Sequence, residues 1–156
     1  MKTKTTIIAA LLATALHTSA ATTQIISINF QGGQISSTGP DVTGTAGYVP
    51  ADNWNNATGA SGTFSNLVDS NGTSTSADVS WQVLNPWDLQ NGDGNGTDQD
   101  MMSGYLDNFG TSSPSDFITI SGIQANKGYD VYVYFNRGAS TYSGLNATDG
   151  INDNTY

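Results

Sequence analysis

The 156-residue chain contains no cysteine and no glutamate, and its single histidine, His17, lies near the N-terminus. The absence of Cys excludes a thiol nucleophile. If His17 is removed with an N-terminal leader, the usual zinc sites, a Ser-His-Asp triad and an imidazole acid–base pair are excluded as well. Only four residues are Lys or Arg, whereas 13 are acidic, all of them Asp. Because neutralisation of phosphates by cations dominates nucleic-acid binding, this composition predicts no nucleic-acid partner.

Lys, Arg and Glu, the usual residues of solvent-facing helix surfaces, are nearly absent, which argues against a helical protein. Gly, Ser, Thr and Asn together make up nearly half of the chain. Short runs of Thr, Val, Ile and Tyr lie between clusters of Gly, Asn and Asp, a pattern typical of an all-β fold. The absence of Cys favours a bacterial envelope protein over a disulfide-built extracellular module.

Residues 1–20 are predicted to be a cleaved signal peptide. Lys2 and Lys4 give a positive start, residues 7–16 are apolar, and small residues follow that allow cleavage after Ala20 or Ala21. The alternative is a buried helix of the folded domain. Neither this run nor any later segment is long enough for a transmembrane anchor. We expect a secreted or cell-surface protein in which residues 21–156 form one domain, with the formal charge moving from −9 to −11 as two lysines leave.

The first strand is expected at residues 25–30, with Ile26, Ile28 and Phe30 on one face. A hairpin follows, in which residues 63–68 and 73–84 flank Asn71-Gly72, a dipeptide favoured in two-residue type I′ turns.

This hairpin turn places Phe64 opposite Val79 and Val68 opposite Thr75. Alternation along the second strand puts Val79 and Trp81 on the buried face, so Trp81 is predicted to be a core residue.

Residues 85–100 are expected to be a loop, and the spacing of the apolar residues at 101–106 indicates a short helix. Residues 116–121 and 129–135 are predicted to pair as strands, and no strand is expected after Arg137. Because a β-sandwich usually has about seven or eight strands, these few strands predict a chain that is incomplete at its C-terminus. A small complete sandwich is the alternative.

The acidic loop at residues 91–100 resembles the start of a Ca²⁺-binding loop, because oxygen ligands alternate and Gly96 takes the sixth position. The match ends at position twelve, where Met102 replaces the usual Glu. The sequence still allows a Ca²⁺ site of another kind, and a solvated loop is the alternative. Its predicted ligands are Asp93, Asn95, Asp98 and Asp100.

Aromatic residues outside the core are candidates for stacking on sugar rings. Trp54 and Trp87 are the first candidates, with Tyr48 and Tyr105 behind them. The neighbouring Asn side chains suit hydroxyl recognition, since one amide both donates and accepts hydrogen bonds. The alternative is that these rings are loop anchors at the end of the sandwich.

Paired carboxylates could perform glycoside hydrolysis, and Asp130 is the carboxylate in the most apolar sequence context. Alternation places it on the face of Tyr132 and Tyr134 without an identifiable partner. The sequence therefore predicts that the chain is not an enzyme.

Several ordered blocks carry a family resemblance. They are the Ile-Asn-Phe strand, residues 47–56, the hairpin at 67–72 leading to Trp81, residues 101–107 and residues 128–135. Together they resemble the N-terminal β-sandwich module of secreted bacterial proteins that often carry a PEP-CTERM-type sorting tail. The resemblance implies an antiparallel β-sandwich, jelly-roll or galactose-binding-like, with no assigned catalytic residues. The chain lacks a sorting tail, which fits a truncated sequence from a longer parent with other domains.

The expected function is that of a non-catalytic secreted module, carbohydrate-binding or adhesive, whose partners are extracellular glycans. Two alternatives stay open at this point. One is a purely structural extracellular module without a ligand, and the other is a fragment of a larger polysaccharide-active enzyme.

Overall fold

The computed structural model describes residues 23–33, 38–107, 116–124 and 128–134, together with strands at 146–148 and 153–155. The predicted signal peptide at residues 1–20 lies outside the described residues and stays a prediction. No helix among the described residues is long and apolar enough to cross a membrane.

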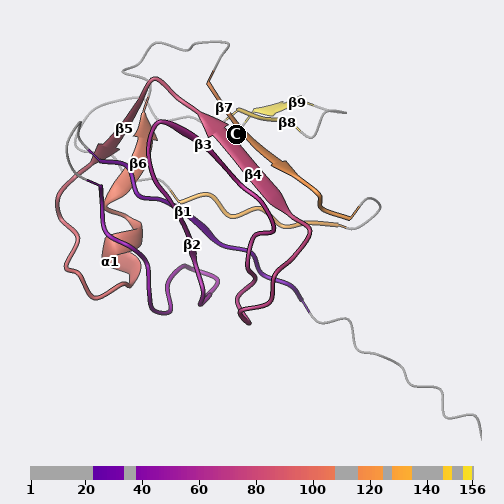
Figure 1. Ribbon diagram of the computed structural model, residues 1–156, viewed down its shortest axis with the longest axis horizontal. Helices are drawn as coiled ribbons and strands as arrows, with labels where there is room; N and C mark the ends of the chain where they lie inside the picture. The colour runs from indigo at the N-terminus through magenta and orange to yellow at the C-terminus, as the bar shows by residue number, and fades with distance from the viewer. Residues whose placement is uncertain are drawn as a thin grey trace, which may run out of the picture.

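The described elements are mostly strands in antiparallel sheets, so the prediction of an all-β fold is confirmed at this level (Figure 1). In chain order they are β1 (Ile28–Phe30), β2 (Asn55–Ala57), β3 (Ser61–Phe64), β4 (Asp78–Gln82), β5 (Asn85–Asp88), α1 (Asp98–Met101), β6 (Gly104–Asp107), β7 (Phe117–Ser121), β8 (Asn146–Thr148) and β9 (Asp153–Thr155). One pair departs from the predicted antiparallel pattern, since β1 and β2 run parallel. The long connection between them makes this possible, because parallel neighbours need a crossover of about a dozen residues or more.

The strand β4 is the centre of a three-stranded sheet with β3 and β7. Its residues alternate between core and surface, and Val79 and Trp81 are 0% and 4% exposed. Phe64 of β3 lies opposite Val79. The predicted pairing of Phe64 with Val79 and the core position of Trp81 are therefore confirmed.

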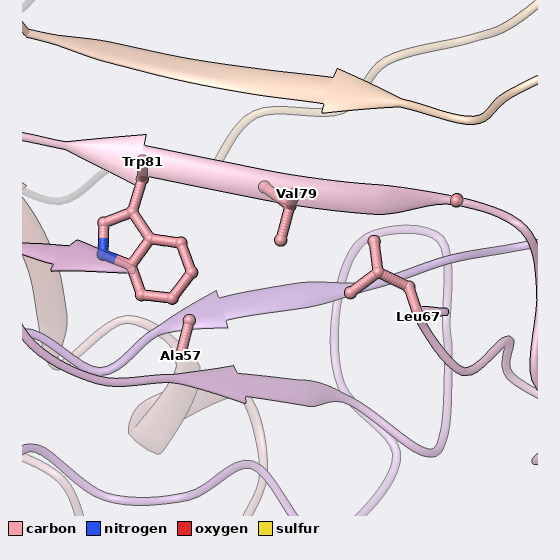
Figure 2. Packing of buried hydrophobic residues seen from close by; sticks show 5 residues of the cluster. Ala57, Leu67, Val79 and Trp81 are labelled. Carbon is pink, nitrogen blue, oxygen red and sulfur yellow. The ribbon is translucent and has the colours of Figure 1, made fainter. Parts of the chain in front are cut away.

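The main core lies between β4 and the parallel pair of β1 and β2. Its buried members, four of them labelled in Figure 2, are Ala57, Leu67, Ala77, Val79 and Trp81. Ile26, Ile28 and Phe30 pack against this cluster, as the alternation of the first strand predicts. The edge of one ring meets the face of the other where Phe30 contacts Trp81, with centroids 5.6 Å apart.

The tip of the β3–β4 hairpin differs from the prediction by one residue. Val68 bridges to Ser74 and not to the residue after it. The turn is closed by the Gly72 N–H, which donates to the Asp69 carbonyl at 2.9 Å. In the Asn71-Gly72 dipeptide only Gly72 has a positive φ, +78°. A type I′ turn needs positive φ at both central residues, so the predicted turn type is wrong.

The carboxylate of Asp69 explains this turn. Its Oδ1 accepts the backbone N–H groups of Asn71 and Thr73 at 2.9 and 3.0 Å, and its Oδ2 accepts a hydrogen bond from Gln24 at 3.2 Å. The Thr73 N–H, together with the weaker effects of Gln24 and Asn71, holds the pKa of Asp69 below its usual value, although burial acts in the opposite direction. The turn is thus built around one charged acceptor.

Residues 85–106 fold differently from the prediction. The predicted loop begins with a strand, β5, and ends in the helix α1. The helix predicted at 101–106 is wrong, since only Met101 is helical and Tyr105 and Leu106 lie in β6. Over so few residues, the spacing of apolar side chains does not separate helix from strand. Glycine is required at position 104, because a Cβ there would lie 1.9 Å from the Gln31 carbonyl oxygen. The backbone of Gln31 therefore lies directly against β6 at this point.

The predicted pairing of residues 116–121 with residues 129–135 is wrong. β7 pairs with β4 over five residues, from Asp78 opposite Ser121 to Gln82 opposite Phe117. Residues 128–134 form no regular secondary structure. The alternation of apolar residues assigns faces but does not identify the neighbouring strand. The prediction of no strand after Arg137 is also wrong, since β8 and β9 form an antiparallel pair.

A second, smaller core fixes the loop between β1 and β2 against α1. Its buried members are Val42, Ala46 and Met101, and Trp54 and Tyr134 are among the residues that pack against it. The connection that the sequence describes as a Gly, Ser and Thr loop is therefore anchored by apolar contacts.

The strand β2 is held by side-chain amides as well as by its backbone. Asn55 accepts a hydrogen bond from the Val68 N–H at 3.0 Å and donates to the Val68 carbonyl at 2.9 Å. Asn56 makes the same two bonds with Val42, at 2.9 and 3.2 Å. Each amide thus satisfies both backbone groups of another segment, as a paired strand would.

Replacing Asn56 by Ala should destabilise the fold by about 2–4 kcal/mol, because both backbone groups of Val42 and the amide of Asn29 lose a partner. Urea denaturation followed by tryptophan fluorescence measures this difference. Asn91→Ala, at an exposed position, is the control and should change stability by less than about 0.5 kcal/mol. Equal stability of Asn56→Ala and the unmodified chain would contradict the bridging role.

Acid should weaken the fold through Asp69. Because its pKa in the folded state is lowered, its contribution is fully present above the ordinary value of 3.8 and is lost as the pH falls through the folded-state value. Asp69→Asn removes the charge, so the free energy of unfolding should fall less steeply in acid. Denaturant titrations at several pH values test this, with exposed Asp130→Asn as the control. An acid slope in Asp69→Asn as steep as in the control would refute this role.

Candidate functional site

The loop at residues 46–51 is small and closed, with buried ends and an exposed tip. Its two end residues exchange backbone hydrogen bonds of 3.1 and 3.0 Å. Gly47 adopts a positive φ of +99°, and its N–H donates to Asp98 of α1 at 2.7 Å. Tyr48 follows at the tip of the loop and is 84% exposed. The loop therefore holds an aromatic ring in solvent on a fixed backbone.

Two tyrosines from residues 128–134 lie beside this loop. The ring of Tyr132 is 6.4 Å from that of Tyr48, with an angle of 38° between the planes. The ring of Tyr134 is 6.5 Å from that of Trp54, and the Tyr134 hydroxyl accepts the Val49 N–H at 3.3 Å. We call Tyr48, Trp54, Tyr132 and Tyr134 the aromatic group. Its outer members are Tyr48 and Tyr132, the latter 53% exposed.

The four aromatic residues predicted to bind ligand lie in two separate regions of the structure. Tyr48 and Trp54 belong to the aromatic group, whereas Trp87 and Tyr105 lie opposite each other in the β5–β6 pair and are half-buried. Trp54 is half-buried too, and its Nε1–H donates to the Ala51 carbonyl at 2.8 Å, as the loop-anchor alternative expects. Ligand binding by any of these residues stays a prediction.

Tyr132 and Tyr134 are additions to the predicted set. The signal was present in the sequence, because alternation assigns both tyrosines to the same face of their segment. Proximity to the loop at residues 46–51 could not be inferred, since it depends on contacts between segments far apart in the chain.

The acidic loop folds around Asp100. This carboxylate is 1% exposed, and its two oxygens accept the backbone N–H groups of Gly94 at 3.0 Å and of Gly96 at 2.5 Å. The loop is therefore organised by hydrogen bonds from its own backbone.

The other predicted calcium ligands also have hydrogen-bond partners. Asp93 accepts the Asn95 N–H at 3.1 Å, and Asp98 accepts the N–H of Gly47. Within the described residues, no three acidic, His or Cys side chains gather as a metal ion requires. The calcium site stays a prediction that this geometry does not favour, and a melting temperature unchanged by a chelator would contradict it.

An open depression of about 350 Å³ lies beside β5. Its polar lining consists of Thr38, Asp88, Gln90 and Ser103. Asp88 is 7% exposed and accepts the Gln90 N–H at 2.9 Å and the Ser103 hydroxyl. Gln90 has a positive φ of +56°, a conformation that a residue with a side chain seldom adopts. Sequence reasoning missed this depression, because it treats residues 85–100 as one undivided loop.

The carboxylates are stabilised without cations. The described residues include no Lys, Arg or His, and Lys127 and Arg137 lie outside them. Backbone N–H groups take the role that basic side chains usually fill, because a hydrogen bond to a charged acceptor is stronger than one between neutral groups. The carboxylates that accept them are those of Asp69, Asp78, Asp88, Asp93, Asp98 and Asp100.

The candidate acid Asp130 is exposed. It therefore lacks the buried, apolar setting that is typical of a general acid. The prediction that the chain is not an enzyme stays a prediction.

No protein-family model, curated protein or solved structure matches this chain significantly. None of these comparisons supports the resemblance to modules of PEP-CTERM-sorted proteins, which stays a prediction.

Added sodium chloride should stabilise the protein. The described residues have no basic side chains that could form ion pairs, while the chain carries a formal charge of −9. Salt then mainly screens the repulsion between carboxylates. The melting temperature should rise as NaCl increases from about 0.01 to 0.15 M, over which the Debye length falls from about 30 to 8 Å. A melting temperature that falls over this range would contradict the dominance of repulsion between carboxylates.

Proposed function

We propose that the protein is a secreted or cell-surface, non-catalytic β-sandwich module that binds neutral extracellular glycans through the aromatic group. The observation that carries this proposal is the 84% exposure of Tyr48 on a closed loop, with the ring of Tyr132 6.4 Å away. Flat, exposed rings can pack against the apolar face of a pyranose, and their burial against a ligand removes apolar surface from water.

Preorganisation supports the proposal. The ends of the loop are joined by two backbone hydrogen bonds, Asp98 holds the N–H of Gly47, and Tyr134 holds the N–H of Val49. A ring on a fixed loop loses little conformational freedom when a ligand binds, so more of the contact energy is available for affinity.

Charge supports a neutral glycan over an acidic one. The chain has a formal charge of −9, and two carboxylates adjoin the loop: Asp52 directly follows it, and Asp98 accepts the N–H of Gly47. An anionic polysaccharide would meet repulsion without a compensating cation among the described residues.

The packing of the parallel β1–β2 pair against the β3–β4–β7 sheet is consistent with a sandwich of two β layers. On β7, Ile118 and Ile120 are paired with Trp81 and Val79, so they share the core face of the sheet. They are nevertheless 47% and 48% exposed. An apolar face of this kind is what one layer of a sandwich presents to the other.

Retention on neutral polysaccharides tests the proposal. Tyr48→Ala and Tyr132→Ala should each weaken binding by about tenfold or more, because burying an aromatic side chain contributes about 1.5–3 kcal/mol. Tyr48→Phe should bind nearly as well as the unmodified chain, since the ring is kept.

The matched control is Tyr129→Ala, which removes another exposed tyrosine, 51% exposed, from the same segment. It should leave retention unchanged. Equal losses in Tyr129→Ala and Tyr48→Ala would remove the aromatic group from the proposal. No retention on any neutral polysaccharide would contradict glycan binding itself and favour a structural module without a ligand.

A further inference from the structure

The chain contains three Asn-Gly dipeptides, which begin at Asn71, Asn91 and Asn95. In such a dipeptide the glycine nitrogen can attack the side-chain amide carbon of Asn, because glycine has no side chain to hinder the approach. A new C–N bond closes a five-membered imide, and ammonia leaves with the proton of the glycine nitrogen. Water then opens the ring to aspartate or isoaspartate. Overall, water is consumed and ammonia is released, with no change in oxidation state.

The attack requires the glycine nitrogen to lose its proton and to turn toward the side chain. A hydrogen bond that holds this N–H therefore opposes the reaction, and the three dipeptides differ in this respect. The Gly72 N–H donates to the Asp69 carbonyl at 2.9 Å. The Gly96 N–H donates to the carboxylate of Asp100 at 2.5 Å, and Gly96 is buried.

The middle dipeptide lacks such protection. Asn91 and Gly92 are both exposed. Among the described residues, none accepts a hydrogen bond from the Gly92 N–H. Among the described residues, the Gly92 N–H therefore has no acceptor that opposes the loss of its proton, although the carbonyl of the same peptide, that of Asn91, accepts a hydrogen bond from Gln99.

We propose that Asn91 is a site of spontaneous deamidation, and that in the folded protein it reacts before Asn71 and Asn95. The product places a new carboxylate next to Gly92, which lines the depression beside Asp88. It adds one negative charge to a chain whose formal charge is already −9. The isoaspartate product also lengthens the backbone where the Asn91 carbonyl accepts a hydrogen bond from Gln99.

Peptide mapping by mass spectrometry tests the proposal during incubation of the folded chain at mildly alkaline pH. The rate at Asn91 should exceed that at Asn71 by about fivefold, the factor that one ordinary hydrogen bond contributes. Asn95 should be slower still, because its glycine N–H is held by a charged acceptor. A rate at Asn71 or Asn95 equal to or above that at Asn91 would overturn the proposal.

Incubation in concentrated urea shows whether the fold or the local sequence causes the faster reaction at Asn91. Each of the three asparagines is followed by a glycine. Unfolding should therefore accelerate deamidation at Asn71 and Asn95 and bring the three rates close together. If the preference for Asn91 is as large in urea as in the folded chain, protection by the fold is not its cause and the proposal fails. Asn91→Gln is the control variant. It should abolish conversion at this position and leave the other two rates unchanged, because attack on the longer side chain requires a less favourable ring.

Discussion

Two neighbouring amides hold this structure together. Asn55 and Asn56 are successive residues of β2, so their side chains point to opposite faces of the strand. Each forms a reciprocal pair of hydrogen bonds with the backbone of one valine, Val68 near the hairpin tip and Val42 in the long connection. A three-residue strand has few backbone bonds of its own, and these amides add two further segments to it. The main core and the second core therefore meet at β2.

Hydrogen bonds between side chains and backbone groups also shape the candidate site. In a region without basic residues, a carboxylate is stabilised by N–H groups, and this requirement bends the chain around it. Asp98 illustrates the consequence, because its bond to Gly47 fixes the loop that exposes Tyr48. Asp100 organises the acidic loop in the same way. The carboxylates that suggested a metal site thus have a structural role, and exposed aromatic rings are the better candidates for ligand contact.

Sequence patterns predicted faces and short-range register well. Alternation identified Val79 and Trp81 as core residues, and the hairpin placed Phe64 opposite Val79. These predictions succeed because the two-residue period of a strand is a property of local backbone geometry. Alternation also predicted one face for Tyr132 and Tyr134, but residues 128–134 form no strand, and the contacts of these tyrosines with Tyr48 and Trp54 were not predicted.

The composition by itself determined that the protein is β-rich, strongly acidic and without thiol chemistry, because these properties follow from which side chains are present. Only the tertiary structure decided that β7 pairs with β4, that Tyr105 lies in a strand, and that Tyr48 is held in solvent beside Tyr132. Each of these outcomes depends on contacts between distant segments, such as the close approach of the Gln31 backbone to Gly104. Local periodicity carries no information about such contacts, since it assigns a face to each residue and leaves the partner of that face undetermined.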